Sequence, residues 1–179
     1  MNKNKILFLG FLLITAISLS PAGAGERVSI EKGAVDVYFT PQEIALYLVN
    51  FIDKSQNKVW AYNPMPGIVR SVIQAKARGL DVRVILDSSQ ITGKRSTANL
   101  LKTAGVPVWI NSRYSMRYNF VICDDDRVGF GSSSFSETVI TGRKGKTSGD
   151  NFNLFTGMRT LSKQYSDEFE RLVAESSRY

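Results

Sequence analysis

Residues that could bind an anion gather between positions 115 and 136. This stretch contains Arg117, Ser132 and Ser134. A guanidinium group presents a planar fork of donors that matches two phosphoryl oxygens, and hydroxyl groups can add further donors. The residues are therefore compatible with a phosphate site. The alternative for Arg117 is a surface arginine at a strand end with no function.

The composition excludes several other kinds of chemistry. The 179 residues include no histidine and one cysteine, Cys123. A His-activated hydrolase, a phosphohistidine enzyme and a His-ligated metal site are all impossible without imidazole. One cysteine cannot form an intramolecular disulfide or a cysteine-based zinc site. We expect Cys123 to be a packed core thiol, with an intermolecular disulfide as the alternative, and we expect no cofactor and no metal.

The charge of the chain is compatible with a polyanionic partner. Lys and Arg number 23 against 16 Asp and Glu, which gives a formal net charge of +7. Part of the excess lies at Arg143, Lys144 and Lys146, within a stretch rich in Gly, Thr and Ser. Such groups suit nucleic acid or anionic lipid. The alternative is a set of solvated loops.

The first 24 residues have the pattern of a secretory signal peptide. Lys3 and Lys5 precede an apolar run from Ile6 to Ile17, and the small residues 22–24 form an A-x-A cleavage site. The run is shorter than the roughly 20 residues that span a bilayer, which argues against the alternative of an uncleaved anchor. We therefore predict cleavage after Ala24, a periplasmic or secreted protein, and a single domain over residues 25–179 with no integral membrane span.

Strands and helices alternate along this predicted domain, which indicates an α/β sandwich with a mixed sheet. A capping box, Thr40 to Glu43, predicts the start of a helix. Residues 124–127 read as the turn of a hairpin, because the spacing of Asp124, Asp125 and Asp126 is not that of a calcium loop. Ligands of such sheets bind beyond the strand ends. The predicted strands are 35–39, 58–62, 81–87, 106–110, 119–124, 128–131 and 152–156, and further helices are predicted at 68–78, 96–104 and 162–175.

The stretch 115–136 resembles the signature of the phospholipase D superfamily. That signature is H-x-K-x4-D on a strand, a tight turn, a second strand and a G-S-x-N segment. The sequence is most similar to small periplasmic endonucleases that carry one motif, with further counterparts at 75–82, 92–93 and 104–107. The resemblance implies a phospholipase D-like α/β/α sandwich and a homodimer in which the two motif regions face each other.

The motif is degenerate at the positions that carry the family's chemistry. Arg117 stands at the histidine position and Asn119 at the lysine position. The remaining counterparts are Asp124 at the aspartate, Gly131 and Ser132 at the Gly-Ser pair, Ser134 at the asparagine, and Asp150 as a candidate for a following pocket acid. In the family one histidine attacks phosphorus, a second protonates the leaving oxygen and the lysines hold the phosphoryl oxygens. A guanidinium has no free lone pair for attack and is a very weak acid, so Arg117 cannot replace that histidine.

These observations leave three hypotheses. The first is a secreted phospholipase D-like pseudoenzyme that binds a phosphate-containing ligand, such as DNA or RNA, or a protein partner. The second is an active nuclease or phosphodiesterase that uses Asp124 or Asp150 with a metal. The third is an interaction module of a secretion or conjugation system, with the loop 137–149 as its contact surface. For Asp124 the alternative to any role in the site is a turn or sheet-end carboxylate.

Overall fold

One mixed β-sheet organises the molecule. The computed structural model describes residues 32–64, 66–91, 96–114, 119–132 and 151–179. In these ranges eight strands lie in the order β1-β7-β6-β5-β2-β3-β4-β8. Their bounds are β1 Ala34–Tyr38, β2 Lys58–Tyr62, β3 Asp81–Asp87, β4 Val108–Asn111, β5 Asn119–Cys123, β6 Arg127–Gly131, β7 Phe152–Thr156 and β8 Ser177–Arg178.

Strand directions change at the centre of this sheet. β2 is parallel to β3 and antiparallel to β5, and β3 is parallel to β4. The pairs β5–β6, β6–β7 and β7–β1 are antiparallel, and β8 runs antiparallel to β4. The predicted mixed sheet is therefore confirmed, with a parallel portion next to an antiparallel one.

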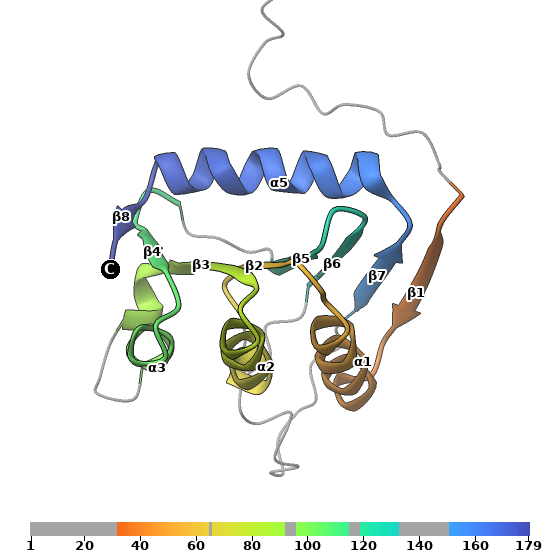
Figure 1. The fold of residues 1–179 in the computed structure, drawn as a ribbon, viewed down its shortest axis with the longest axis horizontal. Helices are drawn as coiled ribbons and strands as arrows, with labels where there is room; N and C mark the ends of the chain where they lie inside the picture. The colour runs from red at the N-terminus through yellow and green to blue at the C-terminus, as the bar shows by residue number, and fades with distance from the viewer. Residues whose placement is uncertain (1–31, 65, 92–95, 115–118, 133–150) are drawn as a thin grey trace, which may run out of the picture.

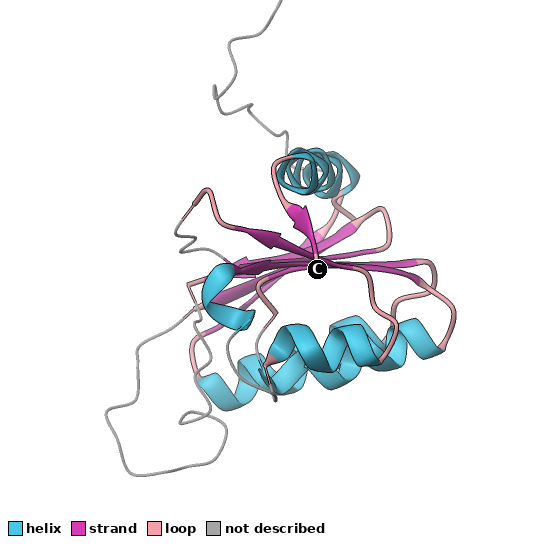
Figure 2. Cartoon of the chain, turned by 90° about the vertical axis from the view of Figure 1, so that its left-hand side faces the viewer, coloured by secondary structure: helices cyan, strands magenta, loops and turns pink. Residues whose placement is uncertain are grey.

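Helices cover both faces of the sheet. Figures 1 and 2 show α5 alone on one face and α1, α2 and α3 together on the other. The helix bounds are α1 Pro41–Asp53, α2 Pro66–Ala77, α3 Thr97–Thr103 and α5 Arg159–Ala174, and a 3-10 turn spans Ser88–Ile91. This arrangement is the predicted α/β/α sandwich.

Local sequence signals explain where two of these helices begin. The backbone N–H of Glu43 donates to the Thr40 hydroxyl at 3.4 Å, and that hydroxyl donates to the Glu43 carboxylate at 2.6 Å. The predicted start of α1 is thus confirmed. α3 begins in a similar way, because the Ser96 hydroxyl accepts from the backbone N–H of Asn99 at 3.3 Å. Each cap satisfies an N–H that the first helical turn leaves without a partner.

The alternation along the strands divides the core into two parts. In β2, Val59 and Ala61 belong to the core under α1, α2 and α3, whereas Trp60 and Tyr62 pack toward α5. Phe169 of α5 is completely buried on that second side. Because both faces of the central strands are buried, their side chains serve packing, and the strand ends and neighbouring loops are where a ligand can reach the sheet.

Candidate functional site

The two strands of the degenerate motif end beside the carboxyl end of β2. Asn119 of β5 pairs with Gly131 of β6, and Gly131 also pairs with Phe152 of β7. On the other side, Phe120 pairs with Tyr62, so Asn63 follows at the same edge of the sheet. We call this edge, marked by Asn63, Asn119, Gly131 and Asn151, the motif edge.

Gly131 is where strand β7 approaches most closely. A Cβ at this position would lie 2.1 Å from the carbonyl oxygen of Asn151 and 2.8 Å from the Cα of Phe152. No residue larger than glycine fits there unless the backbone shifts. The glycine of the motif therefore has a structural cause in this chain, namely the close packing of β6 against β7.

Ser132 holds the ends of two segments together at the motif edge. Its backbone N–H donates to the Asn151 carbonyl at 3.1 Å, and its hydroxyl accepts from the Asn151 N–H at 3.2 Å. Neither of these bonds uses the hydroxyl hydrogen, so the hydroxyl group can still donate a hydrogen bond. Ser132 can therefore take part in anion binding while it fixes the local backbone.

The other predicted binding residues lie outside the described part of the chain. These are Arg117, Ser134, Asp150, Arg143, Lys144 and Lys146. The nearest described residues are Asn119 for Arg117, Ser132 for Ser134 and Asn151 for Asp150. Asn119, Ser132 and Asn151 lie together at the motif edge. The structure thus brings the ends of the motif segments to one place.

Asp124 lies at the other end of β5 from Asn119. Its carboxylate accepts hydrogen bonds from the backbone N–H groups of Gln56, Asn57 and Lys58 at 3.1, 2.8 and 3.2 Å. An Arg127 guanidinium nitrogen lies 3.5 Å from the same carboxylate. Asp124 therefore anchors the α1–β2 connection to the β5–β6 turn, which is the turn-carboxylate interpretation. Its position does not favour a role beside Asn119.

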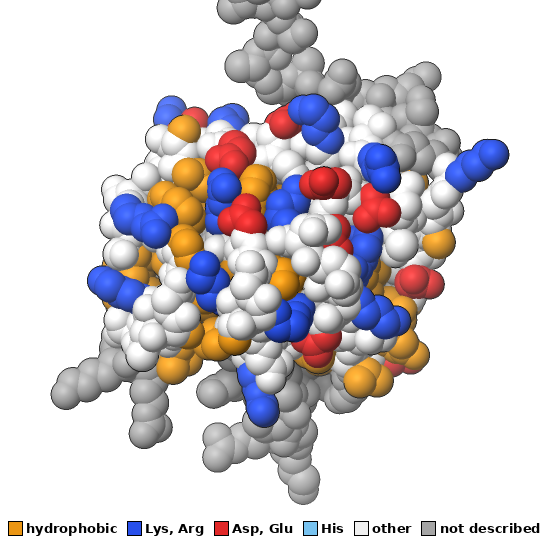
Figure 3. All heavy atoms as spheres, in the orientation of Figure 1, with side chains coloured by type: hydrophobic (Ala, Val, Ile, Leu, Met, Phe, Trp, Pro, Cys, Tyr) orange, Lys and Arg blue, Asp and Glu red, His pale blue; other side chains and the backbone are white. Residues whose placement is uncertain are grey.

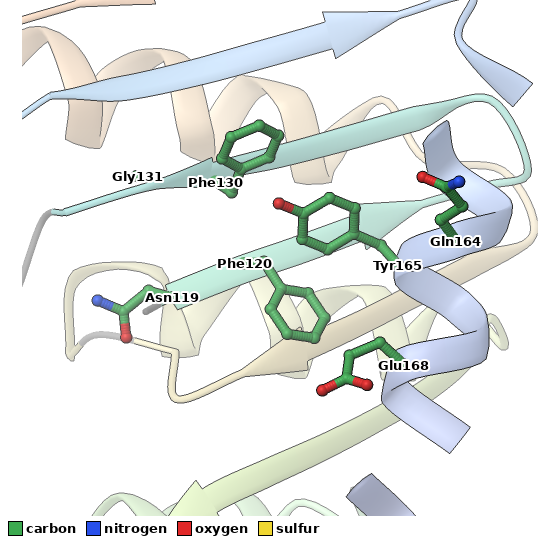
Figure 4. Close-up of a pocket in the computed structure, with 7 residues that line it drawn as sticks. All are labelled: Asn119, Phe120, Phe130, Gly131, Gln164, Tyr165 and Glu168. Atoms are coloured by element: carbon green, nitrogen blue, oxygen red, sulfur yellow. The ribbon is translucent and has the colours of Figure 1, made fainter. Parts of the chain in front are cut away.

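A cavity opens on the α5 side of the sheet next to Asn119 (Figure 4). Its volume is about 390 Å³. The lining comes from three elements: Asn119 and Phe120 of β5, Phe130 and Gly131 of β6, and Gln164, Tyr165 and Glu168 of α5. None of Phe130, Gln164, Tyr165 and Glu168 was predicted from the sequence to belong to a site. The alternating pattern of β6 and the amphipathic pattern of α5 gave no signal that these residues meet around a cavity.

Aromatic side chains can stack on bases of a single strand, but several of those outside the cavity are engaged elsewhere. Trp60 and Tyr62 are buried in the core, and the Arg178 guanidinium lies 4.3 Å from the ring centre of Trp109. Tyr114 is more exposed, and the guanidinium of Arg113 lies 5.6 Å from its ring centre. Tyr118 lies outside the described residues. The aromatic groups that line the cavity next to Asn119 are Phe120, Phe130 and Tyr165.

Cys123 is a core thiol. It is fully buried in β5, and burial raises the pKa of its thiol to about 12. The thiolate is the reactive form of cysteine, so this environment suppresses nucleophilic chemistry. The prediction of a packed thiol is confirmed.

Within the described ranges, no group of three or more His, Cys, Asp or Glu is arranged to hold a metal ion. None of the helices in these ranges is long and apolar enough to cross a membrane. On the face in Figure 3, Lys and Arg side chains lie among Asp, Glu and apolar side chains, so the charges of the described residues alternate there.

A match to a protein family model shows which family the chain belongs to. Residues 48–173 match the family model described as "Cardiolipin synthase, PLD-like domain". The chain belongs to the phospholipase D-like family. The match covers α2, α3 and the strands from β2 to β7, so it includes both strands of the degenerate motif.

Individual relatives share this domain. A phospholipase D from Rickettsia conorii is 30% identical over 112 residues, which are 60% of this chain and 56% of that protein. A mitochondrial cardiolipin hydrolase from Xenopus tropicalis is 33% identical over 111 residues, 62% of this chain and 50% of that protein. The PLD-like chain thus spans about half the length of the curated relatives it matches.

A solved structure extends the likeness to the fold. The phospholipase D family member Nuc from Salmonella typhimurium superposes with a TM-score of 0.70 at 20% identity, and the match covers 83% of this chain and 99% of Nuc. The phospholipase D-like, Nuc-like fold expected from the motif is therefore confirmed.

Proposed function

We propose that this protein is a phospholipase D-like pseudoenzyme that binds a phosphodiester ligand at the motif edge without hydrolysing it, and that the ligand is nucleic acid. The observation that carries the proposal is the pair Arg117 and Asn119 at the motif's histidine and lysine positions, in a chain that contains no histidine. The scaffold around these positions is that of the family, with Asn119 and Ser132 at one edge of the sheet.

The chemistry of these side chains supports binding over hydrolysis. Arginine stays protonated at any physiological pH, so Arg117 supplies positive charge and paired donors but neither a nucleophile nor a useful proton. Asn119 offers an amide without charge, which weakens the stabilisation of oxyanions in a transition state compared with lysine. A second copy of this chain would bring the same residues and would not supply imidazole.

Nucleic acid is the phosphodiester ligand that the remaining features favour. Without Lys3 and Lys5 of the proposed signal peptide the net charge falls from +7 to +5, and the basic group Arg143, Lys144 and Lys146 falls between Ser132 and Asn151, which meet at the motif edge. Such a group contributes to affinity by releasing counterions from a polyanion. The curated relatives named above are a phospholipase D and a cardiolipin hydrolase. An anionic lipid is therefore the competing ligand with which nucleic acid has to be compared.

The proposal includes the location and assembly expected from the sequence. Residues 1–24 act as a cleaved signal peptide, residues 25–179 form one domain in the periplasm or outside the cell, and two copies associate with their motif edges facing each other. Size-exclusion chromatography with light scattering and mass spectrometry of the mature amino terminus test these points. A monomer, or a protein that retains residues 1–24, would contradict them.

A cleavage and retention assay tests the function. The purified protein is incubated with a labelled single-stranded oligonucleotide, with and without Mg²⁺ or Mn²⁺, and retention and products are measured. We expect retention without cleavage under every condition, and a weaker complex for Arg117→Ala. The double variant Arg117→His and Asn119→Lys is the matched control, because it restores the family's residues on the same scaffold. Products formed by the unmodified protein, above those of a protein-free sample, would refute the pseudoenzyme proposal.

A further inference from the structure

The cavity beside Asn119 is larger than a phosphate group requires. Its volume of about 390 Å³ lies in the range of about 300–1,000 Å³ typical of small-molecule sites. It lies between α5 and the strands β5 and β6, so it starts at the motif edge and extends along the α5 face of the sheet (Figure 4). A ligand anchored by phosphate at the motif edge would therefore have room for a further group here.

Aromatic rings form the walls of this cavity and fix one another. The ring of Phe130 stacks on Tyr165 with 5.1 Å between centroids and 16° between planes. Phe120 meets Tyr165 edge to face at 5.2 Å, and the ring centroid of Phe155 in β7 lies 5.0 Å from that of Phe130. Rings held in this way are preorganised, so a planar ligand ring can contact them without a further cost of ordering side chains.

Polar groups surround the aromatic wall. Asn119 lies at the end of the cavity nearest the motif, and Gln164 and Glu168 project from α5 (Figure 4). Both oxygens of Glu168 accept hydrogen bonds from the Arg171 guanidinium at 2.7 Å, which holds that carboxylate in place. Amide groups offer both donors and acceptors, and these match the edges of nucleobases. Burial raises the pKa of Tyr165 to about 12, so its hydroxyl stays protonated near neutral pH.

We propose that this cavity binds a nucleobase of a single-stranded nucleic acid whose phosphate lies at the motif edge. The inference rests on the proposed function, and it adds the substrate class: unpaired rather than duplex strands. Asn119 connects the two parts, because it occupies the motif's lysine position and also lines the cavity. A base inside a duplex is stacked and paired on both sides, so it cannot enter unless it leaves the helix.

An acyl chain of a lipid is the competing occupant, and the lining favours the base. Aromatic rings present flat surfaces that a heterocycle can cover, whereas a hydrocarbon chain offers no hydrogen-bond partner to the amide groups of Asn119 and Gln164. The same two side chains can bond to a base edge. A nucleobase therefore complements the aromatic rings and the amide groups of the lining together.

The first experiment changes the ligand and leaves the protein intact. Fluorescence anisotropy at low salt compares a labelled oligodeoxythymidylate of about 12 nucleotides with a strand of equal length whose sugars lack bases, and with a duplex. We expect the abasic strand to bind roughly 5- to 150-fold more weakly, from the usual contribution of one stacked base. Equal affinities for the two strands would overturn the base site but leave the proposed function standing. Failure of both strands to bind would refute the proposed function itself.

The second experiment changes the cavity wall. Phe130→Leu removes the aromatic face, and Phe155→Leu is the matched control, because Phe155 supports the same stack but does not line the cavity. We expect Phe130→Leu to weaken binding of the thymidylate strand and to leave binding of the abasic strand unchanged, while Phe155→Leu weakens binding of the thymidylate strand less. Equal losses of affinity for the two variants would contradict the inference. It would also be contradicted if Phe130→Leu weakened binding to cardiolipin vesicles but left binding of the oligonucleotide unchanged.

Discussion

Replacing Asp124 should destabilise the fold and leave the binding site intact. The carboxylate accepts three backbone N–H groups of the α1–β2 connection and lies beside Arg127. Gln56 and Asn57 are exposed, so water can partly replace the lost acceptor, and we assign about 1 kcal/mol to each of the three bonds. Asp124 also has a φ of 59°, where alanine costs about 1 kcal/mol.

These contributions give about 4 kcal/mol for Asp124→Ala, which corresponds to a fall of about 8–16 °C in the melting temperature of a domain of this size. Asp124→Asn should lose about half as much or less, because asparagine keeps one carbonyl acceptor and tolerates a positive φ. Thermal unfolding followed by circular dichroism measures both values.

The neighbouring Asp125 provides the control for this series. Its side chain is 91% exposed and forms an ion pair with Lys58 at 2.8 Å. That ion pair lowers the pKa of Asp125, chiefly through the hydrogen bond from Lys58. Exposed pairs contribute little to stability, so Asp125→Ala should change the free energy of unfolding by less than about 1 kcal/mol. Equal melting temperatures for Asp124→Ala and Asp125→Ala would contradict the structural role of Asp124. Loss of nucleic acid binding in a stably folded Asp124→Asn variant would also contradict it.

Three further predictions follow from other positions. Gly131→Ala would bring a Cβ within 2.1 Å of a backbone oxygen, so we expect a loss of about 1–3 kcal/mol in urea unfolding; unchanged stability would contradict the close strand packing. Cys123 should resist thiol reagents at pH 8 until the protein unfolds, because its pKa is about 12, and rapid labelling of the native protein would contradict its burial. Replacing Arg143, Lys144 and Lys146 together by alanine should flatten the log–log salt dependence of DNA binding by about one unit for each phosphate that these side chains neutralise, and an unchanged slope would exclude the group from the interface.

The sequence predicted the elements whose signals are local. The capping box at Thr40 and Glu43 indicated the start of α1, and the alternation through 81–87 indicated β3 with its bounds. The observed bounds differ from the predicted ones where tertiary contacts determine them. β4 begins at Val108, later than the predicted 106, and α5 begins at Arg159, earlier than the predicted 162. The two-residue strand β8 was not predicted, because it is defined by its pairing with β4 and has no pattern of its own.

The features that depend on distant partners could not be predicted in the same way. The hydrogen bonds of Asp124 reach residues 66 to 68 positions away in the sequence, and nothing near residue 124 indicates them. The cavity likewise requires that α5 cross the face of β5 and β6, which follows from sheet order rather than from any one segment. Phe130 and Tyr165 pack against each other beside this cavity, and neither sequence segment indicates it.

Binding without hydrolysis is tested by measuring the retention and the cleavage of a single strand in one sample. With protein in excess over a labelled single strand, the bound fraction is read by filter retention and the intact fraction by denaturing gel, at the same time points. We expect the strand to be retained at low salt and to remain intact. Release of shortened product above the protein-free control, or absence of retention at low salt, would contradict it.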